Sequence, residues 1–227
     1  MTRRPVIFST LSGPSVGGLR KTARRSTQGG ASIILTELRQ RLDLANKWVM
    51  GNTPANDDTH WIRPVKTAIC IACRAAWGDG VFIYASDVGH RNMGQWPHDP
   101  QRRPVNLFVG VPEGHPNRAA HYSEGSLPYG LRHYNVTCLR YEQSGPPKLL
   151  LAAELRFGSG PQVLQDFDNL RSSSAEFRVM VYNLDDAPIA DLVDLIHYAD
   201  TQAGGTYLFA AFADYGFTYE IYRDQRG

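Results

Sequence analysis

The chain has 227 residues, of which 42% are hydrophobic and 20% are charged, and its formal net charge is +2. These values are typical of an ordinary globular protein that is long enough to bury one full core. No apolar run approaches the length that crosses a bilayer, so we expect no membrane partner.

The charge is distributed unevenly along the chain. Residues 1–30 contain six basic residues and no acidic residue, and they are rich in Gly, Ser and Thr. This composition predicts a flexible basic leader over 1–30 and a single α/β domain over 31–227. An organellar transit peptide has a similar composition and is an alternative for the leader. The residues after the leader include 18 basic and 22 acidic residues, a net charge of −4, which argues against a dedicated duplex-DNA binder.

The first half of the domain begins with two expected helices. Apolar residues recur at helical spacing from Ser32 to Gly51, and a second helix is predicted over Val65–Trp77, with Pro64 near its start. Short strands are predicted over 81–85 and 106–111. A long irregular stretch separates these two strands.

The second half shows clearer periodicity. It predicts two strands joined by a short turn, then a helix, a strand, a second helix and a hairpin: 134–141, 149–157, 161–171, 177–182, 189–199, 206–213 and 217–222. The strand at 149–157 is almost continuously apolar, as in strands that are buried on both faces. The expected fold class is therefore α/β, with a central mixed β-sheet flanked by helices.

Two groups of candidate metal ligands lack a complete pattern. Cys70 and Cys73 have the spacing of half a zinc site or a redox pair, but Cys138 is the only other cysteine. Their place on an apolar helix face favours buried free thiols. Five histidines crowd the middle of the chain without a recognisable ligand spacing, namely His90, His98, His115, His121 and His133. The three cysteines and the absence of a secretory apolar region favour a reducing compartment, and we expect a cytoplasmic location.

Glu154 is the most informative residue, because it is a carboxylate inside an otherwise apolar strand. Arg156 follows two positions later, so both side chains project from the same face of that strand. A charge on a buried strand must be paired, bound to a metal or placed at a sheet edge.

The pattern of strand, strand, helix and strand over 134–182 resembles the core of the restriction-endonuclease-like PD-(D/E)XK superfamily, as found in uncharacterised bacterial members. In that superfamily one strand supplies an Asp and the next strand supplies an acid-x-Lys motif. The matching positions here are Asn135, Glu154 and Arg156. The resemblance implies a nuclease-like core over about 130–225, a Mg²⁺ cofactor bound through Glu154 and Asn135, and a nucleic-acid substrate.

Two departures from the family pattern predict a degenerate site. Asn135 replaces the Asp, and an amide holds Mg²⁺ far less well than a carboxylate. Arg156 replaces the Lys, and arginine stays protonated and cannot act as a base. We therefore expect weakly bound Mg²⁺ or no cofactor, and a component that binds nucleic acid or a protein partner rather than an efficient enzyme.

Two alternatives stay open at this point. One is a Mg²⁺-dependent DNA or RNA endonuclease that uses Glu154 with a relocated second carboxylate, for which Glu124, Asp166 and Asp168 are candidates. The other is a purely structural interaction protein. A carboxylate within roughly 4–5 Å of Glu154, close enough to share a metal, distinguishes the endonuclease from both other interpretations.

Overall fold

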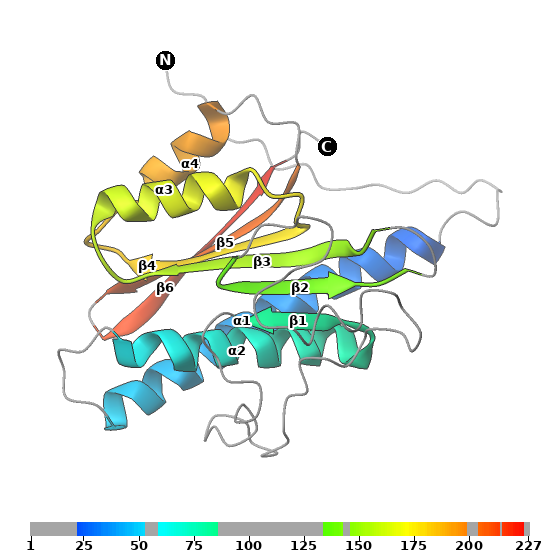
Figure 1. The fold of residues 1–227 in the computed structure, drawn as a ribbon, viewed down its shortest axis with the longest axis horizontal. Helices are drawn as coiled ribbons and strands as arrows, with labels where there is room; N and C mark the ends of the chain where they lie inside the picture. The colour runs from blue at the N-terminus through cyan, green and yellow to red at the C-terminus, as the bar shows by residue number, and fades with distance from the viewer. Residues whose placement is uncertain are drawn as a thin grey trace, which may run out of the picture.

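The computed structural model describes residues 22–52, 59–85, 134–142, 146–198, 204–213 and 215–224. Figure 1 shows one β-sheet between two layers of helices. In chain order the elements are α1 (Thr22–Asn52), α2 (Thr59–Trp77), the 3₁₀ helix η1 (Gly78–Gly80), β1 (Phe82–Ala85), β2 (Val136–Arg140), β3 (Lys148–Arg156), α3 (Gly160–Arg171), β4 (Phe177–Asn183), α4 (Ile189–Tyr198), β5 (Gly205–Ala213) and β6 (Gly216–Asp224).

The six strands are arranged in the sheet in the order in which they occur in the chain, β1-β2-β3-β4-β5-β6. β2 is antiparallel to both of its neighbours, β1 and β3. β3, β4 and β5 run parallel, and β6 returns antiparallel to β5. Helix α3 connects the parallel strands β3 and β4, as such a crossover requires. The predicted mixed α/β sheet is thus confirmed, including the antiparallel pairing of β2 with β3.

Each face of the sheet is covered by its own pair of helices. α1 and α2 pack on one face around Ile83, Leu155 and Val179. α3 and α4 pack on the other face, where Phe167 contacts the ring of Phe209. The continuous apolar character of β3 and β4 follows from this arrangement, because both faces of these strands are buried.

Both N-terminal helices begin earlier than their periodicity indicated. α1 begins at Thr22 rather than Ser32, so the boundary predicted at residue 30 falls inside this helix. No proline interrupts 22–30, and the two glycines there lower helix propensity by only about 1 kcal/mol each. α2 begins at Thr59, and Pro64 lies inside it rather than near its start. Residues 1–21, the strand predicted over 106–111, the candidate Glu124 and the five central histidines lie outside the described residues.

Helix α1 is tied to the far edge of the sheet by polar contacts. The Nδ2 of Asn46 donates to the backbone oxygen of Tyr215 at 2.9 Å, and the hydroxyl of Tyr219 donates to Asp43 at 2.7 Å. Tyr215 has a φ of 72° in the turn between β5 and β6, a conformation that L residues seldom adopt. These contacts join elements far apart in the chain.

Among the described helices, none has the length and apolar content needed to span a membrane.

Candidate functional site

The candidate site lies at the carboxyl end of β3, on the face covered by α3. The pairing of Val136 with Ala153 places Asn135, just before β2, directly opposite Glu154. Arg156 ends β3 on the same face as Glu154. The two neighbouring strands therefore bring together the three residues that the sequence singled out.

Glu154 is held by Asn135. The backbone N–H of Asn135 donates to Oε2 of Glu154 at 3.3 Å, and the Nδ2 of Asn135 donates to the same oxygen. Only 6% of Glu154 is exposed. Burial and the negative charge of Asp166 raise the pKa of Glu154 to about 7, against the lowering effects of the Asn135 hydrogen bonds and of Arg156. Glu154 is therefore about half protonated near neutral pH.

Arg156 is held by Asp166 of α3. The Nε of Arg156 lies 2.6 Å from Oδ2 of Asp166, and this short charged hydrogen bond raises the pKa of Arg156. Side-chain exposure is 39% for Arg156 and 16% for Asp166. The guanidinium is thus reachable from solvent, while the carboxylate that binds it is mostly enclosed.

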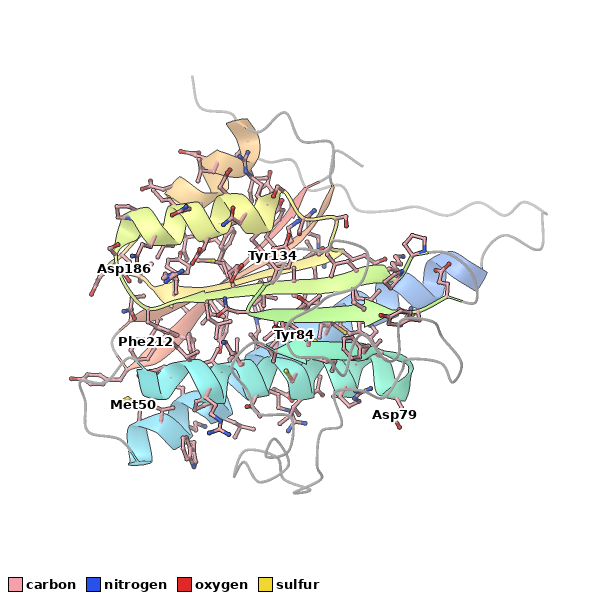
Figure 2. All side chains as sticks on the ribbon, viewed as in Figure 1. Met50, Asp79, Tyr84, Tyr134, Asp186 and Phe212 are labelled. Atoms are coloured by element: carbon pink, nitrogen blue, oxygen red, sulfur yellow. The ribbon has the colours of Figure 1, made fainter. Side chains whose placement is uncertain are left out.

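The start of α3 is fixed by the turn after β4, and this determines where Asp166 lies. The backbone N–H of Gly158 donates to Oδ2 of Asp186 at 3.2 Å. A Cβ on Gly160 would lie only 2.2 Å from the backbone oxygen of Asp186, so only glycine permits this approach. Figure 2 shows Asp186 beside the start of α3, and Tyr134 on the side of the sheet that α3 covers.

The side chains present do not fit a resident divalent cation. Mg²⁺ requires oxygen ligands, but Asn135 turns its nitrogen toward Glu154, and Asp166 binds a guanidinium. Within the residues that the structure describes, no group of three or more His, Cys, Asp or Glu side chains is arranged to hold a metal ion. Asn135 and Glu154 form one hydrogen-bonded pair instead, and Arg156 and Asp166 form another.

The three cysteines form neither a metal site nor a disulfide in the described part of the chain. Cys70, Cys73 and Cys138 are free and fully buried, which confirms the prediction of buried thiols. Burial raises the pKa of Cys70 and Cys73 well above the ordinary thiol value, and a hydrogen bond with Cys138 raises that of Cys73 further. Such thiols are inert rather than nucleophilic.

Asp166 was among the possible second carboxylates predicted from the sequence, but its ion pair with Arg156 was not predicted. α3 buries Val163, Phe167 and Leu170 against the sheet. Asp166 precedes Phe167 and follows Val163 by three positions, so it lies at the edge of the buried stripe. Asp168 instead faces outward with 60% of its side chain exposed, and it pairs with Arg171. Helical spacing is the signal that separates the two aspartates.

Comparisons of the chain with family models, with curated proteins and with solved structures found no match.

Proposed function

We propose that this chain is a nuclease-like domain with a degenerate site, and that it acts as a binding component rather than as an efficient nuclease. One observation carries the proposal: the polar groups at all three motif positions are bound to other groups of the chain. Glu154 is hydrogen bonded to Asn135, and Arg156 is bound to Asp166. Each of these residues therefore has a hydrogen-bond partner within the chain.

The arrangement of the elements supports the resemblance on which the nuclease-like part of the proposal rests. β2, β3, α3 and β4 follow one another in the order expected of the superfamily core. Asn135 lies just before β2, and Glu154 and Arg156 lie on β3, facing the same side. Motifs this short are specific only when their residues lie on adjacent strands.

The charge distribution supports binding through limited surfaces. Residues 31–227 carry a net charge of −4, whereas all charged residues in 1–30 are basic. Nucleic-acid affinity that depends on the basic residues of 1–30 is expected to fall steeply with salt, because it comes from released counter-ions. A protein partner held by the acidic body is expected to show a weaker salt dependence.

The test is a cleavage and binding assay with the full chain. Wild type, Glu154→Ala and the double variant Asn135→Asp with Arg156→Lys are incubated with single- and double-stranded DNA and RNA in Mg²⁺ or Mn²⁺. We expect no cleavage by wild type or by Glu154→Ala, and some cleavage by the double variant, which restores the family pattern. Asp168→Asn changes an exposed aspartate of α3, the helix that carries Asp166, and serves as the matched control.

A metal-dependent endonuclease is the second candidate. It is favoured by one observation: Asp166 binds Arg156, which projects from the same face of β3 as Glu154, and the negative charge of Asp166 raises the pKa of Glu154. Robust cleavage by wild type that Glu154→Ala abolishes would establish this candidate and overturn the binding proposal.

A further inference from the structure

We infer that β6 is a docking edge for a second copy of this chain, and that the two copies pair their β6 strands antiparallel about a two-fold axis at Ile221. The site is the outer edge of β6, the last strand of the sheet, with which no other described strand pairs. This inference goes beyond the proposed function and does not depend on it.

Two hydrogen bonds of β5 show how the backbone groups at this end of the sheet are directed. The N–H of Thr206 donates to the backbone oxygen of Glu176, just before β4, at 3.0 Å. The backbone oxygen of Phe212 accepts from the N–H of Leu184, just after β4, at 2.9 Å. Because backbone groups alternate in direction along a strand, the even-numbered residues of β5 are directed toward β4 and the odd-numbered residues toward β6.

The register of β6 then decides which of its residues are directed outward. The odd-numbered residues of β5 pair with even-numbered residues of β6, as Phe209 does with Glu220. The other residues of β6 therefore direct their N–H and C=O groups away from β5, and these are Phe217, Tyr219, Ile221 and Arg223. Together they form a row of donors and acceptors that another strand can pair with.

The edge lacks the features that usually keep edge strands from pairing. β6 has nine residues, contains neither proline nor lysine, and pairs with β5 without a bulge. Both of its faces are held in place. The hydroxyl of Tyr219 donates to Asp43 of α1 at 2.7 Å, and the ring of Tyr222 lies 5.4 Å from that of His197 in α4. A strand that is already fixed on both faces can receive a partner with little further ordering.

Charge complementarity favours a second copy as the partner. With the axis at Ile221, Arg223 of each copy lies opposite Tyr219 of the other copy, whose hydroxyl holds the exposed Asp43. Arg39 already lies over the ring of Tyr219, 5.6 Å from its centre, so the group that Arg223 complements is the Asp43 carboxylate. Arg223 is exposed and forms no ion pair with a residue that the structure describes.

The same charges select the position of the axis. An axis at Glu220 would place the two Glu220 carboxylates directly opposite each other, which is unfavourable. Axes at Tyr219 or Tyr222 would move Arg223 away from Tyr219 of the other copy, and hence from Asp43. Within one copy Arg223 lies four residues from Tyr219, about 13 Å along the strand, so only a second copy brings these groups together.

The test follows amide hydrogen exchange and sedimentation velocity of the full chain at about 5 µM and about 500 µM. We expect a dimer at the higher concentration, with exchange at the N–H groups of Tyr219, Ile221 and Arg223 slowed about tenfold or more. The N–H groups of Glu220 and Tyr222 are directed toward β5 and should be protected equally at both concentrations. Only pairing along this edge produces such an alternating pattern.

Arg223→Glu tests the register. It should weaken the dimer at least about tenfold, because a glutamate then faces Asp43 of the other copy. Combining it with Asp43→Arg exchanges the two charges and should restore the dimer. Glu220→Gln changes an exposed side chain on the other face of β6 and is the matched control. Arg223→Pro removes an outward N–H that β5 does not need, so it should weaken the dimer while the fold, followed by circular dichroism, is kept.

Two results would overturn the inference. One is a chain that stays monomeric at the higher concentration, with the three outward N–H groups exchanging equally fast at both concentrations. The edge is then free for a strand of another protein. The other is a dimer that neither Arg223→Glu nor Arg223→Pro weakens, since its interface then lies elsewhere. Both results leave the proposed function standing, because that depends on the cleavage and binding assays.

Discussion

Arg156 and Glu154 lie two residues apart on one face of β3, yet the Nε–H of Arg156 donates to Asp166 of α3 and not to Glu154. Glu154 receives its hydrogen bonds from Asn135. The guanidinium of Arg156 is thus directed toward α3. The more deeply buried carboxylate, Glu154, receives its hydrogen bonds from the side-chain amide and backbone N–H of Asn135. Burial is the main reason why the pKa of Glu154 is raised although its carboxylate accepts two hydrogen bonds.

Glu154 is expected to make the protein less stable as the pH rises. Its pKa is about 7 in the folded protein and 4.5 ordinarily, so the folded state binds the proton more tightly. Stability is therefore lost between about pH 4.5 and pH 7, and by pH 8 the loss amounts to about 3 kcal/mol. Glu154→Gln keeps a neutral acceptor for Asn135 and should remove this loss.

The measurement is urea unfolding of wild type and Glu154→Gln from pH 4.5 to pH 8. The difference in the free energy of unfolding should shift in favour of the variant by about 3 kcal/mol over this range. Glu142→Gln, a change at an exposed glutamate, should follow the wild-type curve. Parallel curves for wild type and Glu154→Gln would contradict the prediction.

Asp166→Asn should lower the pKa of Glu154, because it removes the nearby negative charge that raises it. The cost in stability should be small, about 1 kcal/mol or less, since Arg156 is 39% exposed and water screens the lost ion pair. The pKa can be followed by the ¹³C shift of the Glu154 carboxyl group. Asp168→Asn changes an outward-facing aspartate of the same helix and should leave that titration unchanged.

Gly160→Ala should destabilise the protein by about 1–3 kcal/mol, because the new Cβ meets a backbone oxygen that cannot rotate away. The clashing atom is the carbonyl oxygen of Asp186, 2.2 Å from the ideal Cβ position. Gly51→Ala is the matched control, since nothing lies within 4 Å of its added Cβ. Thermal unfolding should separate the two variants, and equal Tm values would show that the turn after β4 shifts freely.

The three cysteines should resist a thiol reagent in the native protein. Cys70, Cys73 and Cys138 have no exposed surface, and burial keeps Cys70 and Cys73 protonated at neutral pH. A colorimetric disulfide reagent should therefore react slowly with native protein and promptly with all three thiols in denaturant. Ser174→Cys places a thiol at an exposed position and should react at once. Prompt labelling of native wild type would mean that α2 detaches readily from β2.

The second half of the fold could be predicted from sequence because its apolar runs are bounded by clear turn residues. β3, α3 and β4 each begin and end within a few residues of the expected positions. The starts of α1 and α2 could not. α1 extends beyond its apolar stripe over polar residues compatible with a helix, and α2 continues toward its N-terminus past Pro64, a residue that usually marks a helix start. Periodicity reports the part of a helix that is packed, not where the helix ends.

At the site, strand pairing was predictable and the choice of ion-pair partners was not. A short turn between two apolar strands places Asn135 opposite Glu154. The partner of Arg156 depends instead on which side of α3 faces the sheet and on where the first turn of α3 is positioned along β3. That is set by Phe167 in the core and by the contact of Gly160 with Asp186, which no local pattern encodes.

The sequential strand order has a consequence for assembly. Each described strand after β1 pairs with the described strand that precedes it in the chain, so the sheet can grow in the order of synthesis. The contacts of Asn46 and Asp43 are not local in this way, since their partners on the β5–β6 hairpin lie 169 and 176 residues later. The carboxyl half of α1 therefore waits for the last strand, and a chain still lacking β6 exposes an unfinished edge to which another chain can pair.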